Sequence, residues 1–278
     1  MKKIIDEGER ILESDQSQST SEHLHRYKIA SVFCTDKIVL DIACGEGYGS
    51  MLLSKTAKFV YGYDIDTETI ERARKKYKKD NIEFGIASTT KIPLENNSID
   101  VIISFETIEH ILDHDGMIAE FKRILKSTGK LIISTPNKYI YTDIIGNKNR
   151  FHLKELYISE FKDLLKRYFK NIEVYYQRFF SASYIYNEIN ENIPSTITWL
   201  RGGFDNVELT KSPDPEYVII IASDEKEVKE TKTIENSFFI EENFRNKIIN
   251  SYQNSSLRYK VGLIVLSPIR WIKNLIKL

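Results

Sequence analysis

The sequence lacks the features that mark several large protein classes. Only two cysteines occur in 278 residues, which is too few for a disulfide framework. No apolar run approaches the roughly 20 residues that cross a bilayer, and the opening residues, MKKIIDEGER, contain no apolar signal segment. We therefore expect a cytoplasmic protein.

Charge of one sign is not in excess either. The chain carries 40 basic and 40 acidic residues, so its composition gives no overall attraction to nucleic acid, and none is expected as a partner. A hydrophobic share of 41% with 29% charged residues is typical of soluble globular proteins. The length allows one sizeable α/β domain with an appendage.

A glycine-rich stretch follows a predicted buried strand at 39–42. Gly45, Gly47 and Gly49 allow a tight turn and a close ligand approach, and the helix predicted behind them offers free N–H groups to an anion. A second predicted strand, 58–63, ends in Asp64, whose carboxylate is suited to accept hydrogen bonds from both hydroxyls of a ribose. These features predict a site for a nucleoside-containing ligand.

The spacing of this motif separates two ligand classes. A dinucleotide fingerprint needs a third glycine where Ser50 stands. Instead, Asp41 precedes the loop in the pattern D-x-x-C-G-x-G-x-G, which resembles motif I of the class I S-adenosylmethionine-dependent methyltransferases. Later segments along residues 22–223 resemble the same family in the same order.

The resemblance implies a Rossmann-like α/β fold, with a seven-stranded sheet, parallel except for its last strand, and helices on both faces. We expect a flexible lead-in at 1–21, the methyltransferase domain at 22–223, and a linker with an amphipathic helical tail at 224–278. Hydrophobic periodicity predicts a first helix at 22–33, a second after the N-cap Asp66, a third ended by Gly129, and a fourth from Ser159. Further strands are expected at 82–86, 99–104, 130–134, 172–176 and 217–222.

S-adenosylmethionine is the cofactor that the resemblance implies. Arg26 would meet its methionyl carboxylate, unless this helix only packs on the surface. Ser88 stands where the family usually carries an acid that binds the adenine amino group, and the backbone of Thr89 offers a second contact to the ring. The expected cofactor-binding residues are Arg26, Asp41, Gly45, Gly47, Asp64, Ile65, Ser88, Thr89 and Phe105.

A second polar segment follows the strand at 99–104, where ligands of open α/β sheets bind. Its Glu-x-x-Glu-His pattern is similar to a metal-binding pattern of certain quinone O-methyltransferases, and one helical turn would bring Glu106, Glu109 and His110 together. The alternative, which we favour, is that these residues orient a loop or a polar network. A divalent metal is therefore not expected.

A hydroxyl acceptor must lose its proton when it is methylated, so the site needs a base. His152, His110 and Glu106 are the candidates, because a neutral imidazole titrates near working pH. His152 comes first, since a position beside aromatic residues in the expected substrate loop, 138–153, has little structural reason to be histidine. The alternative is that His152 only orders this loop.

Three segments, 23–27, 134–138 and 151–155, together resemble methyltransferases of bacterial surface-polysaccharide assembly. This resemblance implies O-methylation of a sugar hydroxyl on a nucleotide-linked or lipid-linked glycan. O-methylation of a quinone precursor or another small molecule is the second expectation, and a non-catalytic cofactor-binding scaffold is the third. DNA amino-methylation is disfavoured, because residues 104–107 replace the Pro-Pro-aromatic motif that it requires.

The last segment, 258–278, combines five basic residues with an apolar stripe that includes Trp271. It is too short to span a bilayer, but an anionic membrane surface would attract it. Peripheral membrane contact is one expectation. Packing against its own domain or against a second subunit in a homodimer is the other.

Overall fold

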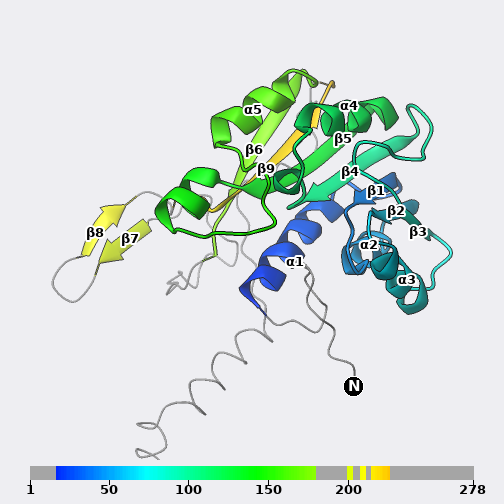
Figure 1. Cartoon of the computed structure of the whole chain (residues 1–278), viewed down its shortest axis with the longest axis horizontal. Helices are drawn as coiled ribbons and strands as arrows, with labels where there is room; N and C mark the ends of the chain where they lie inside the picture. The colour runs from blue at the N-terminus through cyan, green and yellow to red at the C-terminus, as the bar shows by residue number, and fades with distance from the viewer. Residues whose placement is uncertain (1–16, 180–198, 203–206, 211–213, 226–278) are drawn as a thin grey trace, which may run out of the picture.

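The computed structural model describes residues 17–179, 199–202, 207–210 and 214–225, and it contains the expected seven-stranded Rossmann-like sheet (Figure 1). The strand order is β3-β2-β1-β4-β5-β9-β6. Strand β9 runs antiparallel to both neighbours, and the pairs from β3 to β5 are parallel. The strands are β1 (Ile38–Ile42), β2 (Phe59–Asp64), β3 (Ile82–Ile86), β4 (Ile99–Phe105), β5 (Leu125–Pro136), β6 (Asn171–Gln177) and β9 (Tyr217–Ser223).

Helices cover both faces of this sheet, as expected. Apolar side chains of α4 (His114–Ile124) and α5 (Ile158–Lys166) join one buried cluster with the sheet, and those of α1 (Gln18–Ser31) join another. Helix α2 (Tyr48–Leu53) packs beside α1, and α3 (Thr67–Lys76) packs against β2 and β3. Central strands are therefore buried on both faces, which explains the continuous apolar run at 101–103.

Two helix starts show how local sequence sets the boundaries. Asp66 caps α3 as predicted, because its side chain accepts a hydrogen bond from the Glu68 amide. The first helix begins at Gln18, earlier than the predicted range, because the Ser17 side chain accepts from the Thr20 amide.

Gly129 does not end a helix, which corrects one sequence-based prediction. Helix α4 ends at Ile124, and β5 begins at Leu125, which pairs with Ile99 before the register shifts. A Cβ at Gly129 would lie 2.7 Å from the Leu125 side chain and 3.0 Å from the Asp100 carbonyl oxygen. Gly129 therefore lies in an irregular strand. The helical spacing of the residues before it had favoured a helix that continues up to this glycine.

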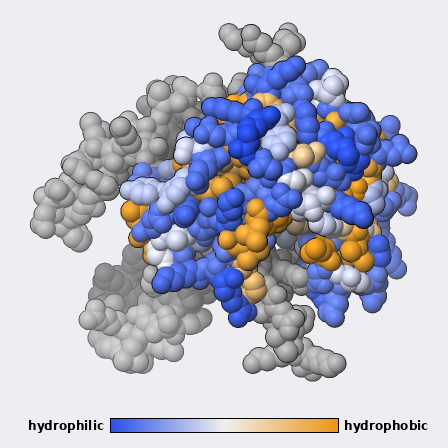
Figure 2. All heavy atoms as spheres, turned by 45° about the horizontal axis from the view of Figure 1, so that its top comes forward, coloured by the Kyte–Doolittle hydropathy of each residue, from blue (hydrophilic) through white to orange (hydrophobic). Residues whose placement is uncertain are grey.

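Several expected features fall outside the described residues: the lead-in up to residue 16, most of the linker and the tail at 258–278. Between β6 and β9, β7 (Trp199–Gly202) pairs antiparallel with β8 (Val207–Thr210). None of the helices in the described part of the chain has the length and apolar character that a membrane crossing requires. On the face shown in Figure 2, hydrophobic residues form separate patches in a mainly hydrophilic surface.

Candidate active site

The carboxyl ends of β1, β2, β4 and β5 meet at one edge of the sheet, because these strands are parallel. The strand order reverses direction between β1 and β4, and ligands of such sheets bind at this point. Two non-glycine residues there adopt the left-handed region: Ala43 after β1, with φ 60°, and Glu106 after β4, with φ 49°. Such strained backbone is concentrated at functional sites.

The glycine loop is held by the acid at the end of β2. One carboxylate oxygen of Asp64 accepts from the Gly45 amide at 2.9 Å, and the other accepts from the Asp66 amide at 2.9 Å. Gly45 has φ +54°, and a Cβ there would meet no atom within 4 Å. Ile65, next to Asp64, leaves 73% of its surface exposed. The corner therefore combines open space, an anchored carboxylate and apolar surface, which fits a nucleoside.

Gly47 allows close packing behind the glycine loop. It precedes α2 with φ +79°, and a Cβ there would lie 2.6 Å from the Phe84 ring. Contact between Gly47 and the cofactor stays a prediction. Its absent side chain lets β3 and the glycine loop pack together.

Asp41, the acid that precedes the loop, is buried and bonded to protein groups. Its two oxygens accept from the Tyr27 hydroxyl at 3.1 Å and from the Ser50 hydroxyl at 2.6 Å. Burial raises the pKa of this carboxyl to about 7, although its two hydrogen bonds act to lower the pKa. Asp41 thus fastens α1 and α2 to the end of β1.

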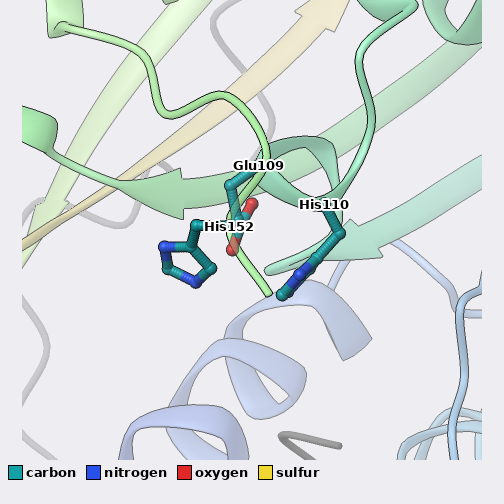
Figure 3. Close-up of side chains that lie close together, drawn as sticks. All are labelled: Glu109, His110 and His152. Carbon is teal, nitrogen blue, oxygen red and sulfur yellow. The ribbon is translucent and has the colours of Figure 1, made fainter. Parts of the chain in front are cut away.

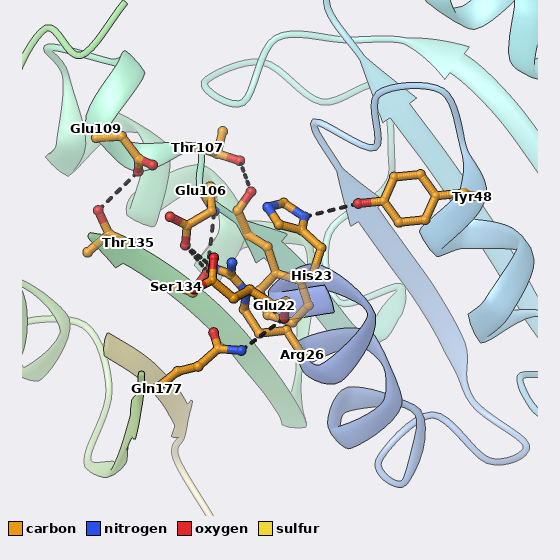
Figure 4. A network of polar contacts seen from close by, with 11 residues as sticks. Glu22, His23, Arg26, Tyr48, Glu106, Thr107, Glu109, Ser134, Thr135 and Gln177 are labelled. Atoms are coloured by element: carbon orange, nitrogen blue, oxygen red, sulfur yellow. Dashed lines mark hydrogen bonds and ion pairs between the residues drawn. The ribbon is translucent and has the colours of Figure 1, made fainter. Parts of the chain in front are cut away.

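Arg26 lies in a buried polar network between α1 and the ends of β4 and β5 (Figure 4). It is only 2% exposed, and its guanidinium forms an ion pair with Glu106. Ser134 accepts from Arg26 at 3.2 Å and donates to Glu106 at 2.5 Å. The structure therefore pairs Arg26 with Glu106, where the sequence predicted a partner in the cofactor, and Glu106 is occupied as an acceptor instead of standing ready as a base.

The remaining predicted cofactor residues lie at the same edge of the sheet, with side chains that contact protein groups. The Phe105 ring packs edge-on against Tyr27, with ring centroids 5.1 Å apart. The Ser88 hydroxyl lies 3.1 Å from that of Thr90 and also accepts from its amide. Contacts of Ser88 and Thr89 with adenine stay predictions, as does contact of Phe105 with the cofactor.

A cluster of one acid and two histidines lies beyond β4 (Figure 3). The short helix η1 (Ile108–His110) supplies Glu109 and His110, a loop supplies His152, and one ligand atom of each lies within 4.8 Å of the others. Glu109 is 1% exposed. Thr135 donates to one of its oxygens at 3.0 Å, and the other is buried without a hydrogen-bond partner. Burial, followed by the Glu106 charge, holds the pKa of Glu109 well above its ordinary value.

This cluster differs from the predicted one because Glu106 is not a member and His152 is. An oxygen and two imidazole nitrogens are ligand types that suit a divalent cation. A buried polar atom without a partner also suits a polar group of an acceptor molecule. The same residues can therefore serve either a metal ion or a substrate hydroxyl.

The loop that carries His152 is bound directly to η1. The backbone carbonyl of Glu109 accepts from the amides of Leu153 and Lys154 at 2.8 and 3.0 Å. His110 Nδ1 lies 3.0 Å from the Phe151 carbonyl oxygen. These contacts bring together segments that are about 40 residues apart in the sequence.

Sequence reasoning assigned no role to Glu155 and Thr142, which both contact this loop. The Glu155 carboxylate lies 2.5 Å from His152 Nδ1, and its other oxygen accepts from the Thr142 hydroxyl. A histidine and an acid three residues apart were a usable signal for the first contact. Nothing in the sequence indicated the second.

Comparison with known proteins finds similarity over part of the chain. Residues 40–133 match the family model described as a methyltransferase domain. A protein of Mycolicibacterium smegmatis, named as a probable S-adenosylmethionine-dependent methyltransferase, is 34% identical over 134 residues, which cover 48% of this chain and 51% of the relative. A ubiquinone biosynthesis O-methyltransferase of Pelagibacter ubique is 34% identical over 102 residues, 36% of this chain and 42% of the relative.

Comparison with solved structures shows similarity in fold. The YcgJ protein of Bacillus subtilis is similar with a TM-score of 0.53 at 15% identity, over 73% of this chain and all of that chain. The chain spans about half the length of the first curated relatives that it matches. Residues 40–133 contain the glycine loop and Asp64, so this part of the chain is similar to the methyltransferase domain of S-adenosylmethionine-dependent relatives.

Proposed function

We propose that the chain transfers a methyl group from S-adenosylmethionine to a hydroxyl of a sugar in a surface glycan or its precursor. The observation that carries the proposal is the histidine cluster, which follows β4 at the same sheet edge as the glycine loop and Asp64. The combined resemblance of residues 23–27, 134–138 and 151–155 to polysaccharide methyltransferases supports the sugar acceptor.

The cofactor would lie over β1 and β2. Asp64 would accept from the ribose hydroxyls, since each carboxylate oxygen has capacity beyond the one amide that it already binds. Ile65 would cover the adenine ring. S-adenosylmethionine supplies an electrophilic methyl group, and alignment with the acceptor supplies most of the rate enhancement.

His152 is the base in this proposal. It takes the proton of the acceptor hydroxyl while the new O–C bond forms and the C–S bond breaks. Glu109, whose pKa burial holds well above its ordinary value, would form a hydrogen bond with a second acceptor oxygen.

The experiment is a transfer assay with methyl-labelled S-adenosylmethionine, the full chain, and a panel of nucleotide-linked and lipid-linked sugars. His152→Ala is expected to lower the chemical rate by roughly 10²–10⁴ and to leave cofactor affinity nearly unchanged. A His152→Ala variant with full activity removes His152 from the mechanism. Turnover on any acceptor excludes the non-catalytic scaffold.

Methylation of a quinone precursor is the second candidate. Its support is the ubiquinone biosynthesis O-methyltransferases among the relatives and the metal-compatible set Glu109, His110 and His152. This candidate predicts activity on a catechol that a chelator abolishes and a divalent cation restores. Activity on sugars that survives the chelator rejects it.

A further inference from the structure

The contacts around His152 restrain its ring from three sides. Tyr141 stacks on the ring with centroids 5.5 Å apart at 30°, and His110 packs edge-on at 5.0 Å. A carboxylate oxygen of Glu155 lies 2.5 Å from Nδ1. The side chains of His152 and Glu155 are only 5% and 10% exposed, so water competes little for this contact.

We propose that Glu155 is a positioning residue: its carboxylate binds the Nδ1–H of His152 and thereby directs Nε2 as the atom that takes the acceptor proton. This inference rests on the proposed function, because it assumes that His152 is the base. In the transfer step, the hydroxyl proton moves to Nε2, the O–C bond forms, the C–S bond breaks, and S-adenosylhomocysteine leaves. The Glu155 carboxylate stabilises the imidazolium that results.

The position of Glu155 is itself fixed from a second element. Thr142, in the π-helix η2 (Tyr139–Ile144), donates its hydroxyl to the other Glu155 oxygen. The same helix carries Tyr141, which stacks on His152. Pi-helical turns often occur at functional sites, and here one such turn orients both the acid and the imidazole.

The charged and titratable groups that face His152 divide into two kinds. Glu109 lies near the ring, and burial holds the pKa of its carboxyl well above the ordinary value, while His110 shares the cluster. Glu155 is the acid in hydrogen-bond contact with the ring. The tautomer with the proton on Nδ1 therefore follows from this contact, as it does in other histidine–carboxylate pairs that act as bases.

The first test uses Glu155→Gln, with the exposed Glu68→Gln as the matched control. With S-adenosylmethionine saturating and the best sugar acceptor, kcat is expected to fall about 100-fold, at the lower end of the range for general-base catalysis, and the KM for the cofactor to change little. The acidic limb of the pH–rate profile is expected to move to lower pH, because the imidazolium loses its carboxylate partner. A purely structural role for Glu155 would not move that limb.

The second test reads the tautomer without any turnover. Imidazole ¹⁵N shifts of the full chain at neutral pH, with His152→Gln used for assignment, are expected to show His152 protonated on Nδ1, and Thr142→Val to broaden or shift that signal. Protonation on Nε2 in the wild type overturns the proposal, as does a Glu155→Gln enzyme with unchanged kcat and pH profile. Inhibition by a chelator that a divalent cation reverses also overturns it, because His152 would then be a ligand. A fully active His152→Ala likewise overturns the proposal, because His152 is then not the base, whereas wild type without turnover on any sugar rejects the proposed function instead.

Discussion

Asp41 is a buried acid whose titration links the cofactor corner to stability. Its pKa is raised from 3.8 to about 7, mainly by burial. A raised folded-state pKa means that the stability contributed by the protonated acid is fully present below about pH 4 and is lost as the pH rises to about 7. At physiological pH the acid therefore costs the fold part of its stability.

Asp41→Asn is expected to remove this dependence. The variant should gain in melting temperature relative to wild type as the pH rises from 4 to 7, and the gain should level off above pH 7. Thermal unfolding across that range measures it, with the exposed Asp80→Asn as control. A difference between variant and wild type that does not change with pH contradicts the assigned burial effect.

Single residues differ in how far the sequence predicts them. The Asp66 cap was predictable, because its partner is two residues away. The ion pair of Arg26 and Glu106 was not, because it joins residues 80 positions apart and depends on the left-handed turn after β4. Because that turn directs Glu106 toward α1, Glu106 does not join Glu109 and His110. The loop at 148–157 supplies His152 as the third member of the cluster instead.

Helix α1 is the element whose packing depends most on one buried charge. Arg26 reaches from α1 to Glu106 and Ser134, and its guanidinium lies 4.8 Å from the centre of the Tyr217 ring. Removing one partner of a buried ion pair leaves the other charge without compensation, which costs about 3–5 kcal/mol.

Arg26→Met is therefore expected to lower the free energy of unfolding by about 3–5 kcal/mol in urea denaturation. The exposed Lys28→Met, on the same helix, should change it by less than about 0.5 kcal/mol. Adding Glu106→Leu to Arg26→Met should recover much of the loss, because no unpaired charge then remains. If the single variant is as stable as wild type, the pair does not anchor α1.

Elements were predictable where one periodicity dominates. The helical spacing of the apolar residues in α5 indicates a helix, and the apolar runs of β1 and β4 indicate buried strands. The junction of α4 and β5 was not predictable, because the glycine that resembles a helix stop is required by contacts with Leu125 of its own strand and with Asp100 of the neighbouring β4.

For the whole chain, the sequence of the tail at 258–278 still predicts contact with an anionic membrane surface. Each basic residue near such a surface contributes about 1 kcal/mol. The full chain should therefore sediment with anionic liposomes, whereas a chain that ends at Leu257 should stay in the supernatant. Equal partitioning of both forms rejects the membrane contact, and loss of a dimer on truncation supports the subunit interface instead.

The central claim is that the corner between β1, the glycine loop and Asp64 binds S-adenosylmethionine. Calorimetric titration of the full chain tests it most directly. We predict one site per chain, with affinity reduced by about 1.5–3 kcal/mol in Asp64→Asn, the scale of hydrogen bonds lost to a charged group, and unchanged in Glu68→Gln. No binding by the folded wild type, or equal affinity in Asp64→Asn, would contradict the claim.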